Sequence, residues 1–218
     1  NPGRSKQPRI AHGNPYAMNT MDFKQLTDLK TKEVPQQLIP ALAKRWSPRA
    51  FDPKPLDEGD LNLLFEAARW APSSTNAQPW RFLLARKGEA MHQRIVDILA
   101  AGNQTWAVHA PVLGMAWART LFPGKDSHNQ HALFDLGAAM QAMMTQATER
   151  GIYGHLMGGF DSEGFKALAP EQEPFEPGVC FALGYPGKAD QLNEPFLSRK
   201  LATRSRLPVS ALVQGLEG

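Results

Sequence analysis

The chain has 218 residues, of which 42% are hydrophobic and 21% charged, a composition typical of globular proteins and long enough for one large or two small domains. Its 24 Lys and Arg residues against 21 Asp and Glu residues leave a formal net charge of +3. Three charges spread over a protein of this size create no strong field for polyanions, so the composition disfavours a dedicated nucleic-acid-binding protein.

The single cysteine and the longest uncharged run indicate what class of protein and which compartment to expect. Cys180 is the only cysteine, which excludes an intrachain disulfide or a cysteine-rich metal site within this chain and favours a cytoplasmic protein. Because Cys180 lies in an apolar run, we expect a buried structural thiol. The longest stretch without a charged residue, from Ile98 to Ala118, is interrupted by Gly, Asn, Gln, His and Pro residues, so no membrane span is expected.

The two ends of the chain differ from its middle. Residues 1–33 are polar and rich in Pro, Gly, Asn and Lys, which predicts an N-terminal arm. Met18 and Met21 would each serve as a start, so residues 1–20 are either part of that arm or residues that precede the natural protein. No internal repeat or change of composition divides the middle, so we expect one α+β domain over residues 34–208 and a tail over residues 209–218.

Hydrophobic spacing predicts the elements of this domain in chain order. The first helix stops before Pro48, and Asp57 is a good N-cap for the second. The expected elements are helices over residues 34–45 and 57–71, a strand over 80–86, a helix over 89–101, a strand over 111–118, a helix over 128–150, a strand over 152–156, a helix over 161–169 and a strand over 178–185.

The helix over residues 128–150 has an unusual pattern, because Leu, Phe, Ala and Met residues cover nearly every face of it. A helix that is apolar all round must be buried on all sides. Two arrangements satisfy this requirement: a central position in the domain, or an interface between subunits that the polar chain ends embrace.

Two polar segments follow the first two helices. Arg45-Trp46-Ser47-Pro48-Arg49 places two guanidinium groups and a hydroxyl close together, which suits an anion, although a solvated helix end has the same composition. Pro72-Ser73-Ser74-Thr75-Asn76-Ala77-Gln78-Pro79 is a loop rich in hydrogen-bonding side chains. Such a loop suits a heteroaromatic edge or, equally, a turn that bonds its own backbone.

Two further segments lie nearer the C-terminus. Met157-Gly158-Gly159-Phe160 follows a predicted strand, and its paired glycines let backbone N–H groups approach a flat ligand or form a tight turn. Arg204-Ser205-Arg206 repeats the Arg and Ser composition of the first segment and, by itself, is typical of a solvated tail. The absence of Gly-x-Gly-x-x-Gly and P-loop sequences disfavours a Rossmann or P-loop nucleotide site.

Taken together, the four segments resemble the nitroreductase family of FMN-dependent oxidoreductases. The likeness rests on Arg-x-Ser-x-Arg-x-Phe, Pro-Ser-Ser-x-Asn-x-Gln-Pro-Trp, a long apolar helix leading to Gly-Gly-Phe, and a C-terminal Arg-Ser-Arg-Leu-Pro, in that order over residues 34–208. The resemblance implies a three-layer α+β fold, in which helices flank a central mixed or antiparallel sheet. It also implies an intertwined homodimer with FMN at the subunit interface.

The resemblance further implies a reaction, in which NADH or NADPH reduces FMN and FMN reduces a nitroaromatic, a quinone or a related small organic acceptor. Alternatives on the same scaffold are dehalogenation, dehydrogenation, flavin fragmentation, or flavin binding without turnover. Since the flavin carries the chemistry, no catalytic side chain and no metal are expected. The expected partners are a second subunit and a small-molecule acceptor, with neither nucleic acid nor membrane.

Residue by residue, the resemblance assigns a cofactor site. Its phosphate end would be bound by the two Arg and Ser segments, through Arg45, Ser47, Arg204 and Arg206. Arg49 would lie near N1 and O2 of the flavin, where a guanidinium stabilises negative charge. A backbone N–H of the Gly158-Gly159 turn would bond N5, and Trp46 and Met157 are further expected cofactor-binding residues. The other subunit would contribute Pro72, Ser73, Ser74 and Asn76, which would border the ring and the phosphate. The helix over residues 128–150 would lie in the dimer interface, and Trp106 is either a pocket wall over the flavin or a core residue.

Overall fold

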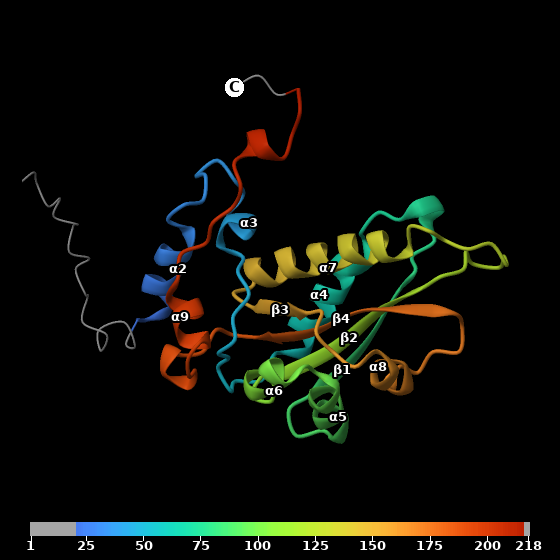
Figure 1. Ribbon diagram of the computed structural model, residues 1–218, viewed down its shortest axis with the longest axis horizontal. Coiled ribbons are helices and arrows are strands. Elements are labelled where there is room, and N and C mark those ends of the chain that lie inside the picture. The colour runs from blue at the N-terminus through green and yellow to red at the C-terminus, as the bar shows by residue number, and fades with distance from the viewer. Residues whose placement is uncertain (1–20, 216–218) are drawn as a thin grey trace, which may run out of the picture.

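Four apolar segments form the central sheet of the computed structural model, which describes residues 21–215 (Figure 1). The sheet has the order β1-β2-β4-β3, and every neighbouring pair is antiparallel. All four predicted strands are therefore confirmed, although the last begins three residues earlier than expected. Their bounds are β1 (Trp80–Arg86), β2 (Val112–Arg119), β3 (Tyr153–Met157) and β4 (Phe175–Gly184).

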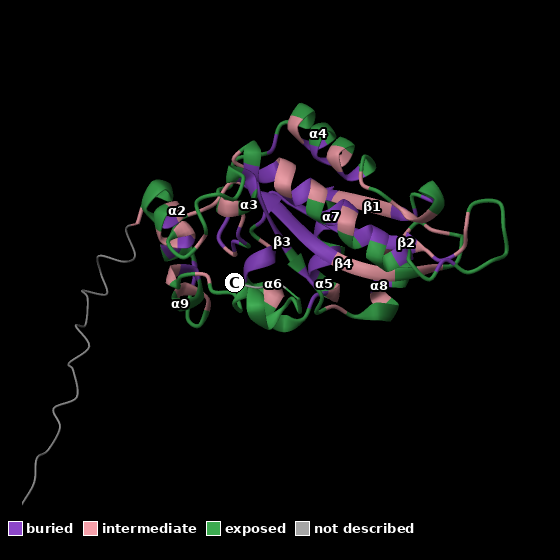
Figure 2. Ribbon diagram, turned by 90° about the horizontal axis from the view of Figure 1, so that it is seen from above, coloured by how far each residue is buried: buried purple, intermediate pink, exposed green. Residues whose placement is uncertain are grey.

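Helices cover both faces of this sheet, and the buried residues concentrate in the strands and in the helix faces turned toward them (Figure 2). One layer consists of α4 (Glu58–Arg69) and α7 (Ala132–Glu149). The other consists of α5 (Ala90–Ile98), α6 (Ala101–Ala107) and α8 (Ser162–Leu168). The helix α4 begins where predicted, because Oδ1 of Asp57 accepts a hydrogen bond from the N–H of Gly59 at 2.7 Å. The three-layer α+β fold is confirmed.

Close packing makes the middle of the sheet a rigid platform. Every residue of β2 except Arg119 is buried. A Cβ at Gly114 would lie 2.2 Å from Cζ of Phe181, so only glycine lets that ring cross the strand. A Cβ at Gly154 of β3 would lie 2.1 Å from Sδ of Met144, so α7 sits directly on β3. The strand β3, whose C-terminal end carries one of the predicted site segments, is thereby fixed against the core.

The helix α7 differs from its prediction in two ways. It begins at Ala132, not at residue 128, and only one face of it is buried. On the opposite face, Leu133 is 48% and Phe134 is 80% exposed within the described chain. Of the two expected arrangements, a central position is therefore wrong, because residues 21–215 leave this face exposed, and burial in a subunit interface stays a prediction. None of the helices in this range is long and apolar enough to cross a membrane.

The first and last helical segments of the described chain fold onto one end of the sheet, where α2 (Phe23–Thr31), α3 (Pro40–Lys44) and α9 (Phe196–Leu201) lie side by side (Figure 1). Two predictions fail here. Residues 23–31, expected in a polar arm, form a helix that buries Leu26, and the helix expected over residues 34–45 is only five residues long. The rest of the expected arm, residues 1–20, lies outside the described residues.

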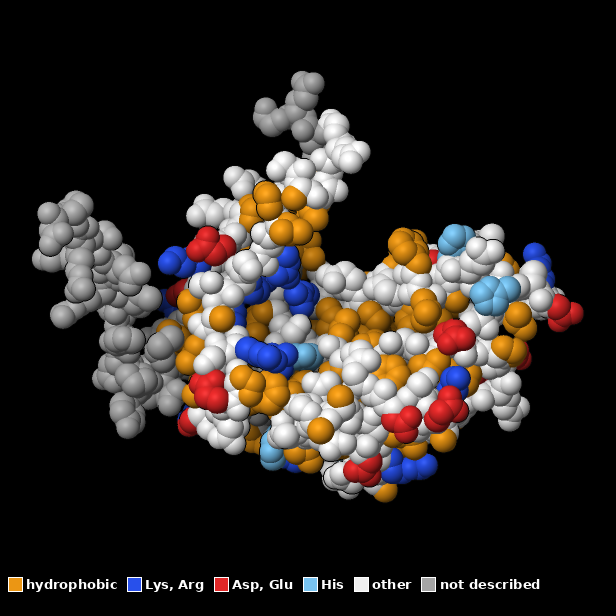
Figure 3. Space-filling view, viewed as in Figure 1, with side chains coloured by type: hydrophobic (Ala, Val, Ile, Leu, Met, Phe, Trp, Pro, Cys, Tyr) orange, Lys and Arg blue, Asp and Glu red, His pale blue; other side chains and the backbone are white. Residues whose placement is uncertain are grey.

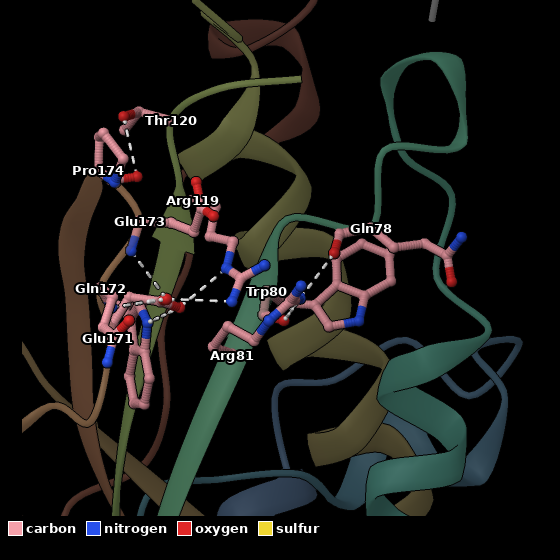
Figure 4. Close-up of polar contacts among 10 residues, drawn as sticks. Gln78, Trp80, Arg81, Arg119, Thr120, Glu171, Gln172, Glu173 and Pro174 are labelled. Atoms are coloured by element: carbon pink, nitrogen blue, oxygen red, sulfur yellow. Dashed lines mark hydrogen bonds and ion pairs between the residues drawn. The ribbon is translucent and has the colours of Figure 1, made fainter. Parts of the chain in front are cut away.

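A buried carboxylate holds together the opposite end of the sheet (Figure 4). The Glu171 side chain accepts hydrogen bonds from Nε1 of Trp117 at 3.2 Å and from Nε and Nη2 of Arg119 at 2.9 and 3.0 Å. Burial tends to raise the pKa of Glu171, but the hydrogen bonds from Arg119 and Trp117 outweigh it and lower the pKa to about 2. Beside this cluster, Nη1 of Arg81 donates to the carbonyl oxygens of Gln78 and Trp80, which fixes the end of the polar loop over residues 72–79.

Candidate cofactor site

The two Arg and Ser segments meet where α2, α3 and α9 lie side by side, and they enclose a cavity of about 200 Å³, which we call the basic cavity. Lys and Arg side chains gather around a hollow on this face (Figure 3). Seven of its eleven lining residues are Lys or Arg, and none is acidic. The lining consists of Lys30, Arg45, Trp46, Ser47, Arg49, Phe196, Arg199, Lys200, Thr203, Arg204 and Arg206.

The cations of the basic cavity repel one another, and among the described residues the only carboxylate that shifts the pKa of a lining lysine is Asp190, which lies outside the lining and acts on Lys200. Burial, together with the charges of Arg204 and Arg49, lowers the pKa of Lys30 to about 8. Burial also lowers the pKa of Lys200 to about 8 and lowers the pKa of Arg45. A cluster of partly desolvated like charges is costly unless an anion neutralises it. The electrostatics of the cavity therefore favour an anionic ligand.

Two buried donors in the basic cavity have no hydrogen-bond partner among the described residues: Nε1 of Trp46 and Nε of Arg49. Buried donors in native proteins are nearly always paired, so these two N–H groups suit a ligand that brings acceptors of its own. FMN carries a phosphate, hydroxyl groups and ring oxygens, and so fits both the charge and the donors of this cavity.

Besides lining the basic cavity, Arg204 has a structural role that the sequence did not indicate. Its Nε donates to the carbonyl oxygen of Lys30 at 2.6 Å, and its Nη1 and Nη2 donate to the carbonyl oxygens of Arg45 and Ala43. These bonds tie α2 to the end of α3, whose last carbonyls have no partner within the helix. Arg204 therefore builds the basic cavity as well as lining it.

Lys30 is a lining residue that the sequence reasoning missed. Its Nζ donates to the carbonyl oxygens of Ala202 at 2.6 Å and Arg199 at 3.4 Å, at the C-terminal end of α9. It also lies 5.2 Å from the ring centroid of Trp46. The signal was the helical spacing of Leu26, Leu29 and Lys30, but the polar composition around it led to the prediction of an arm.

The glycine turn after β3 lies against α6. The N–H of Ala100 donates to the carbonyl oxygen of Gly159 at 2.9 Å, and a Cβ at Gly159 would lie 3.2 Å from Cβ of Ala100. The helix expected over residues 89–101 therefore ends at Ile98 as α5, and α6, over residues 101–107, is a further helix that the sequence did not predict. Met157 is buried, whereas Gly158 and Gly159 are exposed, and none of the three lines the basic cavity.

The polar loop over residues 72–79 lies at the N-terminal end of α7. There the N–H of Ser74 donates to Oδ2 of Asp135, in the first turn of α7, at 3.1 Å, and the N–H of Gln78 donates to Oγ of Ser73 at 3.0 Å. Thr75, Asn76 and Gln78 all have positive φ, a conformation that non-glycine residues seldom adopt. Within one chain, the loop residues Pro72, Ser73, Ser74 and Asn76 are thus separated from the basic cavity.

Comparison with known proteins finds similarity over three of the four segments named above. The family model described as the nitroreductase family matches residues 42–105 and 98–185, which include the first Arg and Ser segment, the polar loop and the glycine turn. The chain belongs to the nitroreductase family.

Individual nitroreductase relatives cover the chain to different extents. A solved structure described as an oxidoreductase containing FMN is 31% identical, with a TM-score of 0.76 over 84% of this chain and 92% of its own. A putative NAD(P)H nitroreductase of Staphylococcus haemolyticus is 26% identical over 193 residues, 69% of this chain and 88% of its own length. A putative NADH dehydrogenase/NAD(P)H nitroreductase of Streptomyces coelicolor is 36% identical over 66 residues, which is 30% of this chain but only about a third, 32%, of that relative.

In this nitroreductase-family chain, a buried histidine supports the first Arg and Ser segment. His155 of β3 lies with Nδ1 2.8 Å from the carbonyl oxygen of Pro48, to which it donates, and its ring packs on Trp106 with centroids 4.6 Å apart. Burial lowers the pKa of His155 to about 4 despite the bond to Pro48. Trp106 is itself 2% exposed and therefore packs in the core, and it also lines a second cavity, while its expected place over the flavin stays a prediction.

We expect His155 to make the unfolding free energy about 2 kcal/mol lower at pH 5 than at pH 7. The pKa of His155 is near 6.5 in the unfolded chain and about 4 in the folded one. Between these values the unfolded state binds more protons, so stability falls as the pH falls from 6.5 toward 4. Denaturant unfolding at both pH values should show a smaller loss for His155→Asn, which keeps an N–H donor but does not titrate. An equal loss in both proteins would contradict this assignment.

Proposed function

We propose that the chain is an FMN-dependent oxidoreductase that transfers hydride from NADH or NADPH, through FMN, to a nitroaromatic, a quinone or a related small organic acceptor. The observation that carries this proposal is the basic cavity, in which seven cations and two unpartnered buried donors surround a space without an acidic residue. Two relatives support it, since one is described as an oxidoreductase containing FMN and the other as a putative NAD(P)H nitroreductase.

In this proposal the chain binds and orients the cofactor. Arg45, Ser47 and Arg206 bind the phosphate, with the Trp46 N–H as a further donor, while Arg204 and Lys30 hold the segments that carry them. FMN, when bound, supplies the transfer of hydride. Arg49 places positive charge beside the electron-rich edge of the flavin, and the exposed backbone of Gly158 and Gly159 borders the ring, with the buried Met157 beneath it. No side-chain nucleophile or base is required.

We also propose that the protein is a homodimer, in a reducing compartment such as the cytosol, in keeping with its buried thiol Cys180. The exposed apolar face of α7 supports the dimer, because Leu133 and Phe134 lie there uncovered in the single chain. The separation of the polar loop from the basic cavity supports it as well. A second copy packed on α7 would let Pro72, Ser73, Ser74 and Asn76 complete the cofactor site of its partner.

The proposal predicts a yellow protein that releases FMN when it is denatured. Under anaerobic conditions, NADH or NADPH should bleach the flavin absorbance, and an added quinone or nitroaromatic should restore it. Titration with each nicotinamide in turn identifies the donor. A colourless protein that does not bind added FMN would overturn the proposal, whereas a flavin that neither nicotinamide reduces would favour one of the other flavin reactions on this scaffold.

A further inference from the structure

A second cavity, of about 310 Å³, shares Arg49 with the basic cavity but otherwise has a different lining. Its volume lies within the range of small-ligand pockets. We call it the Phe51–Trp106 cavity. Besides Arg49 it is lined by Phe51, Lys87, Trp106, His109, Gln191 and Leu192, among others.

One wall of the Phe51–Trp106 cavity is apolar and rigid. The rings of Phe51 and Trp106 are stacked, with centroids 6.3 Å apart and an interplanar angle of 28°. Each of the two residues is 2% exposed, and Leu192 is 7% exposed. Behind Trp106 lies the ring of His155, so the wall is supported by the core. Because these side chains are almost fully covered, they give the cavity a narrow, rigid apolar floor, and the exposed Pro53 adds to its apolar lining. Such a floor suits the edge of a small aromatic ring.

The rest of the lining is basic or donates hydrogen bonds. Lys87 and His109 are exposed at the cavity, Arg49 is partly buried, and Gln191 adds an amide. No acidic residue lines it within the described chain. In addition, Nε1 of Trp106 is buried and has no hydrogen-bond partner among residues 21–215. An apolar ligand alone would leave these charges and this donor unmatched.

We propose that the Phe51–Trp106 cavity binds a small aromatic carboxylate. The ring packs on the wall of Phe51, Trp106 and Leu192, and the carboxylate lies among Lys87, His109 and Arg49. A bare phosphate would leave the apolar wall exposed, and a neutral aromatic would leave the cations without a counter-charge. The combination of the two surfaces selects a ligand that carries both features.

The shared Arg49 couples this cavity to the cofactor, a consequence that rests on the proposed function. A carboxylate beside Arg49 neutralises charge that the basic cavity otherwise offers to FMN. Binding of the aromatic carboxylate therefore lowers the affinity for FMN. By linkage, bound FMN lowers the affinity for the carboxylate by the same factor.

The test is calorimetric titration of the full chain, with and without saturating FMN, using 2-naphthoate and its uncharged analogue 2-naphthamide. We expect 2-naphthoate to bind roughly tenfold more tightly than 2-naphthamide, which corresponds to about one charge-assisted contact. The Lys87→Ala/His109→Ala variant should lose roughly this tenfold advantage, because both side chains are exposed and dispensable for folding. Lys54→Ala, a neighbouring exposed lysine outside the lining, is the matched control and should bind as the unaltered chain does.

Three outcomes would overturn the inference: no binding of either probe, equal binding of both, or undiminished 2-naphthoate binding by the Lys87→Ala/His109→Ala variant. Loss of 2-naphthoate binding in Arg206→Ala but not in that double variant would place the ligand in the basic cavity and would overturn it too. If FMN fails to bind while 2-naphthoate behaves as expected, the Phe51–Trp106 site stands and the proposed function fails.

Discussion

The Arg45→Ala/Arg206→Ala variant should bind FMN roughly 10²- to 10⁴-fold more weakly than the unaltered chain, since each charge-assisted contact contributes about 1.5–3 kcal/mol. Both guanidinium groups have only local contacts in the described chain. Nη1 of Arg45 lies 3.4 Å from Oγ of Ser47, and Nη1 of Arg206 donates to the carbonyl oxygen of Ser205 at 2.7 Å. Their remaining N–H groups are therefore available to a phosphate.

The fold should survive this double substitution. Removing two like charges from the basic cavity relieves repulsion, so the melting temperature without FMN should not fall. Flavin fluorescence titration at fixed ionic strength measures the affinity. Arg94→Ala/Lys188→Ala removes the same charge from exposed positions outside the cavity and serves as the control. Equal FMN affinities in the two double variants would show that the basic cavity does not hold the phosphate.

Arg204→Ala should have a different signature, a loss of about 3 kcal/mol in unfolding free energy together with loss of FMN binding. The guanidinium donates to three backbone carbonyls, those of Lys30, Ala43 and Arg45. Alanine leaves all three without a donor where α2, α3 and the C-terminal segment meet. The expected loss exceeds the gain from removing one charge, because three part-buried carbonyls lose their donors at once.

Arg199→Ala separates the loss of hydrogen bonds to the backbone from the removal of a positive charge. It removes a guanidinium from the same cavity, and that group lies 5.8 Å from the ring centroid of Phe196. Urea denaturation of the FMN-free proteins should therefore show a large drop in midpoint for Arg204→Ala and little change for Arg199→Ala. Similar midpoints for the two variants would refute the structural role of Arg204.

Local patterns in the sequence were enough to predict the strands and main helices of the central fold. β1 was predicted with the bounds that it has, and Asp57 marked the start of α4, because a short apolar run that follows Pro79 and an N-cap residue are both local signals. Apolar side chains around nearly all of α7 were also correctly recognised. That pattern did not by itself predict burial within one chain, since Phe134 is 80% exposed in the described residues.

The site was predictable only in part, for the same reason. The motif residues Arg45, Ser47, Arg49 and Arg206 do line one cavity. Lys30 and His155 were missed, since neither has a recognisable neighbour in sequence: each acts through a backbone carbonyl far along the chain. The double role of Arg204 likewise depends on carbonyls that only the folded chain brings to it. Long-range hydrogen bonds of this kind leave no pattern in the sequence.

The basic cavity also imposes an order of events on the making of the protein. Its two halves come from residues 30–49 and 196–206, and the bond from Arg204 to Lys30 spans 174 residues. During synthesis, domains fold as the chain emerges, N-terminal parts first. The first half of the cavity is therefore incomplete until residues 196–206 have left the ribosome. If the proposed cofactor site is correct, the cofactor cannot be captured before that point, and a chain terminated after β4 that contains the whole sheet would lack it.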